Sequence, residues 1–432
     1  MRSNRRIAQA CSAAAVGLAA LCGPEGPAAA EAPPAAVLTV AAAQEMVHDL
    51  IPEVERLRGL AFKRPVPVEI VGEEGARRYM MARLEAFGHE EQLEWLGKAY
   101  ELLLLLPEGG DLLELMLDAM RDQAAGFYDP GEGTYYLMDR VPPSAAPIFS
   151  VHELTHALED QHYDLDSRLR EVIGSEDALI ARGAVHEGSA TLLMTLYSTE
   201  AILNGKLDVS ALLALAETEG ASKGKLAELP PVLVRQLLAP YVLGMSFLTG
   251  GNLFELAAGY PVDSVDRAFR ESPRSSEQIL HPEKYWDDEH RDEPRAVDLG
   301  DAGGLLGGSW ELKSHGVLGE LIVGTLVGAA TPLDQVDMGA TDPGAWTNAA
   351  AAGWGGDRWE LWSRGSSNIV LWSSVWDSEE DALEFAEALP RSKTLGWKRE
   401  GDRVAVVAGR AGKKAPKLFE RMLSVVEVSA SR

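Results

Sequence analysis

The spacing of apolar residues predicts that the first part of the chain is mainly helical. Apolar side chains recur every three or four positions over 39–58, 73–105 and 110–122, the period of a helix with one buried face. The segment VPVEIV at 66–71 reads as a short strand. In GFYDPGEGTYYLMD (126–139), turn residues separate two aromatic-rich runs, which predicts a β-hairpin.

Two long helices are expected after this hairpin. Pro147 is tolerated only in the first turn of a helix, so the first helix should begin between residues 144 and 147. The second is predicted over about 175–204. Helices resume over 208–258, where we expect prolines to interrupt the pattern at Pro230, Pro231 and Pro240. The polar, turn-rich stretch 271–295 should end the helical part.

The pattern changes from about residue 296, where glycine-rich segments separate shorter elements. After an apolar helix at 316–330 and a loop at 349–358, we expect a hairpin at 359–376, a capped helix at 378–389, a strand at 402–409 and a final helix at 415–426. The fold class predicted is therefore α+β. A mainly helical domain with a small sheet would span 31–295, and a small α+β domain would span 296–432.

Residues 1–30 are predicted to be a secretory signal peptide. A basic start is followed by an Ala-rich apolar stretch too short for a confident membrane span, and small residues end at Ala30, where we expect cleavage. This predicts export to the periplasm or the extracellular space. Lipid attachment at Cys22 is disfavoured, because bulky Leu21 precedes it. Since Cys11 and Cys22 are the two cysteines of the chain, the mature protein would have no thiolate ligand and no disulfide.

Charge and hydropathy narrow the range of partners. The net charge of −26 would become −28 after cleavage, because the leader holds three arginines and one glutamate. Such a charge argues against a nucleic-acid or anionic membrane partner. No second membrane span is expected, since the apolar stretch 316–330 is short and contains Glu320. Nothing in the sequence indicates an oligomeric state.

The segment SVHELTHALEDQHYDL at 150–165 carries the clearest chemistry. His152 and His156 lie one helical turn apart on the same face, so both imidazoles can reach one metal ion, with Glu153 beside them to take a proton from water. Chance predicts fewer than about 0.03 such pentapeptides in this chain. We therefore predict a metal site over the alternative of surface histidines on a solvated helix.

Two residues compete to be the third ligand. His162 has the spacing of the metzincin pattern, but Glu159 replaces its glycine, and in a continuing helix His162 lies about 240° around the axis from His156. Glu187 lies in a small and apolar stretch of the next helix, where a buried carboxylate needs a partner such as a cation. The nearby glycines, Gly183 and Gly188, suggest close approach to another backbone, which we expect to be that of the His152 helix.

His152-Glu153-x-x-His156 with Glu187-Gly188-x-Ala190 resembles the gluzincin metallopeptidases. The wider segments HELTHALEDQHYDL, VHEGSAT, PYVLGMSF, SSEQILHPEKY and GWGGDR are similar to a family of secreted bacterial and archaeal zincin-like proteins over about 120–360. The resemblance implies a zincin-like catalytic domain in which His152, His156 and Glu187 bind Zn²⁺. One departure is His186, where many gluzincins have Asn.

The same resemblance implies a mechanism but does not single out the residue that stabilises the oxyanion. Glu153 would be the general base, and a Tyr, His or Arg would stabilise the oxyanion; Tyr241 leads the candidates, followed by His281 and Tyr285. Part of 126–138 would pair with the backbone of a peptide or protein substrate. We thus expect a secreted zinc peptidase. The alternatives are a non-catalytic binding or structural protein on a zincin scaffold and a non-peptide zinc hydrolase.

The role of the C-terminal unit depends on its tryptophans. They could form a substrate platform or lid, but aromatic residues in a small domain more often fill its core. We expect the core role for Trp354, Trp359, Trp362, Trp372 and Trp376.

Overall fold

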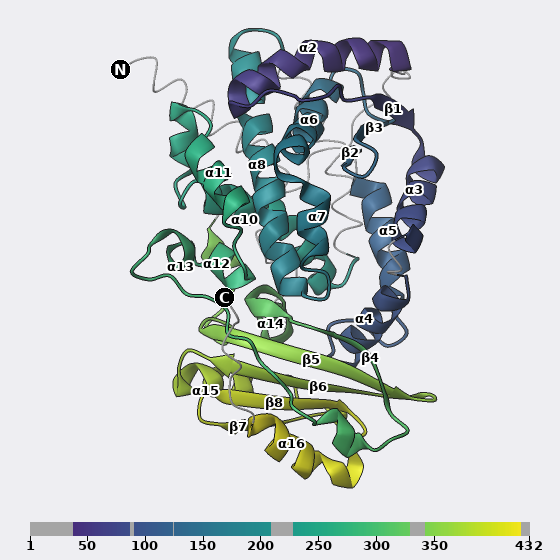
Figure 1. The fold of residues 1–432 in the computed structure, drawn as a ribbon, viewed down its shortest axis with the longest axis vertical. Helices are drawn as coiled ribbons and strands as arrows, with labels where there is room; N and C mark the ends of the chain where they lie inside the picture. The colour runs from purple at the N-terminus through teal and green to yellow at the C-terminus, as the bar shows by residue number, and fades with distance from the viewer. Residues whose placement is uncertain (1–37, 87–89, 124, 209–227, 329–341, 425–432) are drawn as a thin grey trace, which may run out of the picture.

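The computed structural model describes residues 38–86, 90–123, 125–208, 228–328 and 342–424. The expected leader, both cysteines and much of the expected helical stretch 208–230 lie outside the described residues. The described part has two layers, a helical body and a five-stranded sheet beneath it (Figure 1). Helices and strands are both well represented, so the predicted α+β class is confirmed.

The helical body contains a three-stranded sheet and most of the long helices. In chain order its elements are α2 (Val40–Arg58), β1 (Val68–Val71), α3 (Glu73–Ala86), α4 (Glu90–Leu102), α5 (Leu112–Gln123), β2 (Gly126–Asp129), β3 (Thr134–Met138), α6 (Ala146–Tyr163), α7 (Leu165–Arg170), α8 (Glu176–Leu203), α10 (Pro231–Leu248), η2 (Leu253–Ala258), α11 (Val262–Arg270), α12 (Ser276–Leu280) and α13 (Glu283–Trp286).

The small sheet has the order β1-β3-β2, which leaves β2 at an edge. β3 runs parallel to β1 and antiparallel to β2, so the predicted hairpin is confirmed. The hydroxyl groups of Tyr135 on β3 and Ser150 on α6 lie 3.1 Å apart, which fixes the sheet against α6. As expected, Pro147 lies in the first turn of α6.

α8 is the central helix of this body, with α6 on one side and α10 on the other. Its start is set by Ser175, whose side chain accepts a hydrogen bond from the backbone N–H of Ala178. A Cβ added to Gly188 would lie 2.3 Å from the carbonyl carbon of Gly244 on α10. The helix that approaches α8 closely at Gly188 is therefore α10, and the expected approach of the His152 helix at this glycine was wrong.

Several boundaries differ from expectation. The predicted helix at 73–105 is two helices, α3 and α4, and the polar stretch 271–295 contains the short helices α12 and α13. Pro240 lies inside α10 and does not interrupt it. Among the described residues, α10 is the one helix long and apolar enough to cross a membrane, but 67% of that span is buried inside the protein. Its packing against α8 and α14 (Gly319–Val327) accounts for its apolar composition.

The second sheet has the order β4-β5-β6-β8-β7. Its strands are β4 (Glu311–Gly316), β5 (Trp354–Arg364), β6 (Ser367–Trp376), β7 (Leu395–Glu400) and β8 (Arg403–Gly409), and its helices are α15 (Glu379–Ala388) and α16 (Ala415–Leu423). The hairpin, the Ser378-capped helix, the strand β8 and the last helix are as predicted. The expected loop 349–358 was wrong at its end, because Trp354–Arg358 begins β5.

The tryptophans of this unit fill its interior. Four of the five are fully buried, and Trp362 is partly buried, so they serve as core residues. One hydrophobic cluster runs without a break from the helical body into the sheet face that carries Trp372, while α16 packs on the opposite face. The domain boundary at residue 296 stays a prediction; α14, which follows β4, packs back among the helices.

Candidate metal centre

The helices α6 and α8 bring His152, His156 and Glu187 together. Nε2 of His152 lies 3.1 Å from Oε2 of Glu187 and 3.0 Å from Nε2 of His156. Nε2 of His156 lies 3.4 Å from the same carboxylate oxygen. Three ligand atoms thus converge on one point from two helices.

These separations fit a metal ion. In a tetrahedral site with metal–nitrogen distances of about 2.0–2.1 Å, neighbouring ligand atoms lie about 3.3 Å apart. Two imidazoles and one carboxylate also form a donor set that suits zinc. The side chains are largely buried, with exposed fractions of 9% for His152, 12% for His156 and 26% for Glu187, so a fourth position can still face solvent.

The electrostatics of the cluster are those of an anion held between two imidazoles. Burial lowers the pKa of His156, but the charge and hydrogen bond of Glu187 together with the charges of Glu153 and Glu159 outweigh it and raise this pKa to about 9. Burial raises the pKa of Glu187, but the charge of His156 and the hydrogen bonds from both histidines lower it below the usual range. The carboxylate is therefore ionised, as a ligand must be.

Glu153 lies on α6 next to His152 and is tied to the edge strand of the small sheet. Its Oε2 accepts a hydrogen bond of 2.8 Å from the backbone N–H of Tyr128 on β2. Burial raises the pKa of Glu153, and the charges of the two histidines oppose this shift. The hydrogen bond fixes the carboxylate between the helix and the strand.

Of the three candidate oxyanion donors, Tyr241 is the one that contacts the cluster. Its ring stacks on His152 with centroids 5.9 Å apart and planes 18° from parallel, and 38% of the residue is exposed. The charge of Glu187, followed by burial, raises the pKa of Tyr241 well above its usual value, so the phenol stays protonated. His281 and Tyr285 are engaged elsewhere, with Glu320 Oε1 at 3.0 Å and the backbone oxygen of Glu271 at 2.7 Å.

His162 points away from the cluster. Its Nε2 lies 2.8 Å from the backbone oxygen of Ala61, and α6 runs on to Tyr163 without the break that a metzincin needs. Glu159, at the position of the metzincin glycine, is fully buried and accepts a hydrogen bond of 2.6 Å from Arg58 Nε. The structure therefore brings Glu187, and not His162, to the two motif histidines.

His186 is adjacent to Glu187 but belongs to the interior. Its ring stacks on Phe269 with centroids 5.4 Å apart, and burial lowers its pKa to about 3. A neutral, packed imidazole here stabilises the contact between α8 and α11 and is not one of the grouped ligand atoms.

Sequence reasoning missed the buried arginine behind the cluster. Arg58, at the end of α2, pairs with Glu159 on α6 and with Asp266 on α11, the latter at 2.8 Å. Ser189 on α8 donates to the same oxygen of Glu159. The network thus joins α6 and α8, the two helices that carry the candidate ligands. The sequence signal was Glu159, which lies three residues after His156 and therefore on the same face of the helix. A carboxylate buried on that face needs a cation.

A second group of carboxylates in the described part of the chain does not resemble this centre. The carboxylates of Glu277, Asp292 and Asp377 surround Lys284 Nζ at 2.6, 3.0 and 2.9 Å, so a lysine fills the place of a cation.

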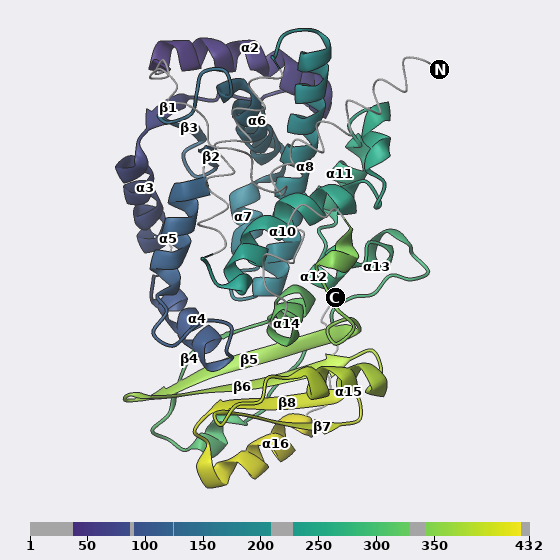
Figure 2. The same cartoon turned by 180° about the vertical axis from the view of Figure 1, so that it is seen from behind.

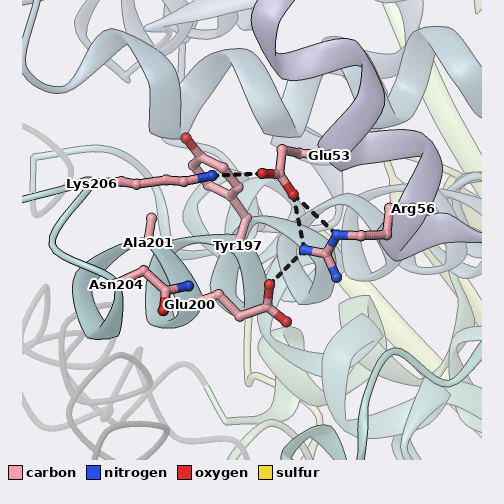
Figure 3. Close-up of a pocket in the computed structure, with 7 residues that line it drawn as sticks. All are labelled: Glu53, Arg56, Tyr197, Glu200, Ala201, Asn204 and Lys206. Carbon is pink, nitrogen blue, oxygen red and sulfur yellow. Dashed lines mark hydrogen bonds and ion pairs between the residues drawn. The ribbon is translucent and has the colours of Figure 1, made fainter.

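A pocket of about 250 Å³ lies at the C-terminal end of α8 (Figure 3). It is lined by Glu53, Arg56, Tyr197, Glu200, Ala201, Asn204 and Lys206. Its charges pair with each other, as in the 2.7 Å contact of Lys206 Nζ with Glu53 Oε1. Tyr197 follows Glu187 by ten residues, which is about 15 Å along a helix. The pocket is therefore separate from the candidate metal centre.

In a comparison with protein families, the model of a domain of unknown function (DUF8575) matches residues 311–414. This region covers the second sheet and α14 and contains none of the clustered residues. No curated protein and no solved structure matches the chain.

Proposed function

We propose that this protein is an exported zinc peptidase with a zincin-like catalytic domain. The convergence of His152, His156 and Glu187, with Glu153 held beside them, is the observation that carries the proposal. A purely structural metal site has no use for a carboxylate next to its open position, whereas a hydrolase needs one.

His152, His156 and Glu187 would hold the ion. Zinc bound there would supply a Lewis acid that acidifies a water molecule and polarises the peptide carbonyl. Glu153 accepts the proton from water and passes it to the leaving amine, since its carboxylate is fixed next to the ligands. Tyr241 is protonated and partly exposed beside His152, so its hydroxyl can donate a hydrogen bond to the oxyanion.

The substrate would be an extended segment of peptide or protein. β2 is an edge strand, paired with β3 on one side only, and its residue Tyr128 contacts Glu153 from the other side. A peptide added along this edge would lie next to the general base and would pair with outward-facing main-chain groups of β2 other than the Tyr128 N–H, which is donated to Glu153.

The deciding experiment compares the chain from residue 31 onward with Glu153→Gln. Both proteins are loaded with zinc, their metal content is measured, and each is incubated with an unfolded protein substrate. We expect cleavage by the parent and a loss of about 10³-fold in the variant, because a general base typically contributes 10²–10⁴-fold.

The outcomes separate the alternatives. Cleavage lost while zinc is retained supports a peptidase with Glu153 as its base. A folded, zinc-loaded parent that cleaves no peptide but hydrolyses esters or other amides would be a non-peptide hydrolase. A parent that binds zinc and hydrolyses nothing would be a binding or structural protein.

A further inference from the structure

Positive charge gathers at one end of this acidic molecule. Residues 391–399 contain four Lys or Arg and no Asp or Glu, and so do residues 410–417. We refer to these two segments together as the basic corner. From 389 to 417 there are nine Lys or Arg against two acidic residues, a net charge of +7 in a chain whose total is −26.

The fold places the two segments side by side. β7 and β8 are antiparallel neighbours with Leu395 opposite Ala408, and the backbone N–H of Gly409 donates to the oxygen of Thr394 at 2.7 Å. This contact places Lys393 and Arg410 at the same end of the strand pair. The short helix η6 (Gly412–Lys414) and the first turn of α16 then add Lys413 and Lys417.

These cations differ from most of those in the helical body. Arg391, Lys393, Arg410, Lys413 and Lys417 are all exposed, and none forms an ion pair with a described residue. In the helical body, by contrast, arginines such as Arg56, Arg170 and Arg270 pair with nearby carboxylates. Like charges gathered without counter-ions cost free energy unless an anionic partner neutralises them.

The position and composition of the corner favour a surface as its partner. β7 and α16 form the end of the molecule opposite α2 (Figures 1 and 2). The edge strand β7 also exposes 42% of Trp397, on the opposite face of the strand from its neighbour Lys398. Exposed indole rings are characteristic of protein surfaces that lie at lipid headgroups.

We propose that the basic corner docks this protein on a membrane surface rich in anionic phospholipid. The acidic remainder of the molecule is repelled by such a surface, so the protein would bind through this end alone, with the metal centre held away from the lipid. Each Lys or Arg near an anionic membrane strengthens binding about five-fold, so five unpaired cations suffice for reversible binding. The inference does not depend on peptidase activity.

The test is sedimentation with vesicles of phosphatidylcholine containing about 30% phosphatidylglycerol, beside vesicles of phosphatidylcholine alone. The chain from residue 31 onward is used, because it contains every described residue and lacks the apolar leader sequence. We expect binding to the anionic vesicles only, weakening as the ionic strength rises from about 0.05 to 0.3 M.

Two matched variants locate the surface. Arg391→Gln/Lys413→Gln/Lys417→Gln should lower the partition coefficient at least about ten-fold. The control Arg77→Gln/Arg78→Gln/Arg270→Gln removes the same charge from exposed positions of the helical body and should bind nearly as well as the parent. Thermal melting checks that both variants are folded. Trp397→Ser should weaken binding several-fold without a change of charge.

Three results would overturn the proposal. The parent could fail to bind anionic vesicles at low salt. Both triple variants could lose binding equally, which would make it an effect of net charge. Finally, the parent could bind a soluble polyanion such as heparin and not the vesicles, which would identify a polymer as the partner.

Discussion

The backbone N–H of Tyr128 donates a hydrogen bond of 2.8 Å to Oε2 of Glu153. This contact joins the edge strand β2 to the helix that carries both histidines, and it uses a donor that faces away from β3. The phenol of Tyr128 makes a separate contact, donating to Asp160 at 2.9 Å. The orientation of Glu153 therefore depends on the backbone of residue 128 and not on its side chain.

Tyr128→Pro should impair hydrolysis without loss of metal. Proline removes the N–H donor, and edge strands tolerate it where that N–H points away from the sheet. We expect kcat to fall at least about ten-fold, because Glu153 loses its fixed position. Tyr128→Ala is the control, since it removes the same side chain and keeps the donor; it should cost about 1 kcal/mol of stability with nearly normal kcat. Equal losses of kcat in the two variants would contradict this account.

Zinc should stabilise the folded protein through Glu187 and not through His162. A ligand present at about 100 times its dissociation constant adds about 2.7 kcal/mol to the free energy of unfolding. Thermal melting with and without zinc should therefore show an increase in Tm of several degrees in the parent and in His162→Gln. Glu187→Gln should lose most of this increase, because the neutral amide is a poor ligand. A shift lost in His162→Gln would instead favour the metzincin arrangement.

The glycines of α8 differ in what surrounds them. A Cβ on Gly188 would lie 2.3 Å from the backbone of Gly244, whereas one on Gly183 would lie 3.8 Å from Pro240, an ordinary contact. Gly183→Ala should thus stabilise the protein by up to about 1 kcal/mol, since Gly is costly in a helix interior. Gly188→Ala should destabilise it by about 3 kcal/mol, because α8 and α10 must move apart. Urea unfolding of both variants measures the difference, and similar effects would contradict it.

Local patterns predicted the grouping of His152, His156 and Glu187 better than the packing of the helices. The motif histidines are four residues apart, so any helix places them on one face, and the small apolar surroundings of Glu187 identified a carboxylate that needs a cation. Which helix approaches Gly188 depends on tertiary packing, and the sequence suggested α6 where the structure has α10. Glycines inside a helix indicate close contact with another backbone, but they do not identify the helix that makes this contact.

Other misses have similar physical causes. β7 is mostly exposed, so it lacks the alternation of apolar and polar residues that identifies a strand, and β4 is largely exposed as well. Pro240 lies inside α10 because tertiary packing outweighs its local cost. The negative net charge of the whole chain gave no sign of the basic corner, although a count of charged residues restricted to 389–417 reveals it.

Buried carboxylates at the junction of the helices and the second sheet make stability depend on pH. Burial raises the pKa of Glu176 and of Asp177 to about 7, and that of Asp357 to about 6. In the unfolded chain these groups have pKa values of about 4, so the folded state binds protons more tightly. Their contribution to stability is complete below about pH 4 and is lost as the pH rises through 6–7. At saturating zinc, the free energy of unfolding should therefore be at least about 1 kcal/mol lower at pH 8 than at pH 5.5.

Asp177→Asn tests this assignment. The amide oxygen can still accept from the backbone N–H of Ser276, which donates to Asp177 Oδ1 at 2.6 Å, while the ionisable proton is gone. The variant should lose less stability than the parent between pH 5.5 and 8, and at pH 8 it should be the more stable of the two, because no charge has to be buried. Asp288→Asn is the matched control, since that side chain is 86% exposed, and it should leave the slope against pH unchanged. If urea unfolding gave the same slope for parent and Asp177→Asn, the pH dependence would have to come from groups outside this junction.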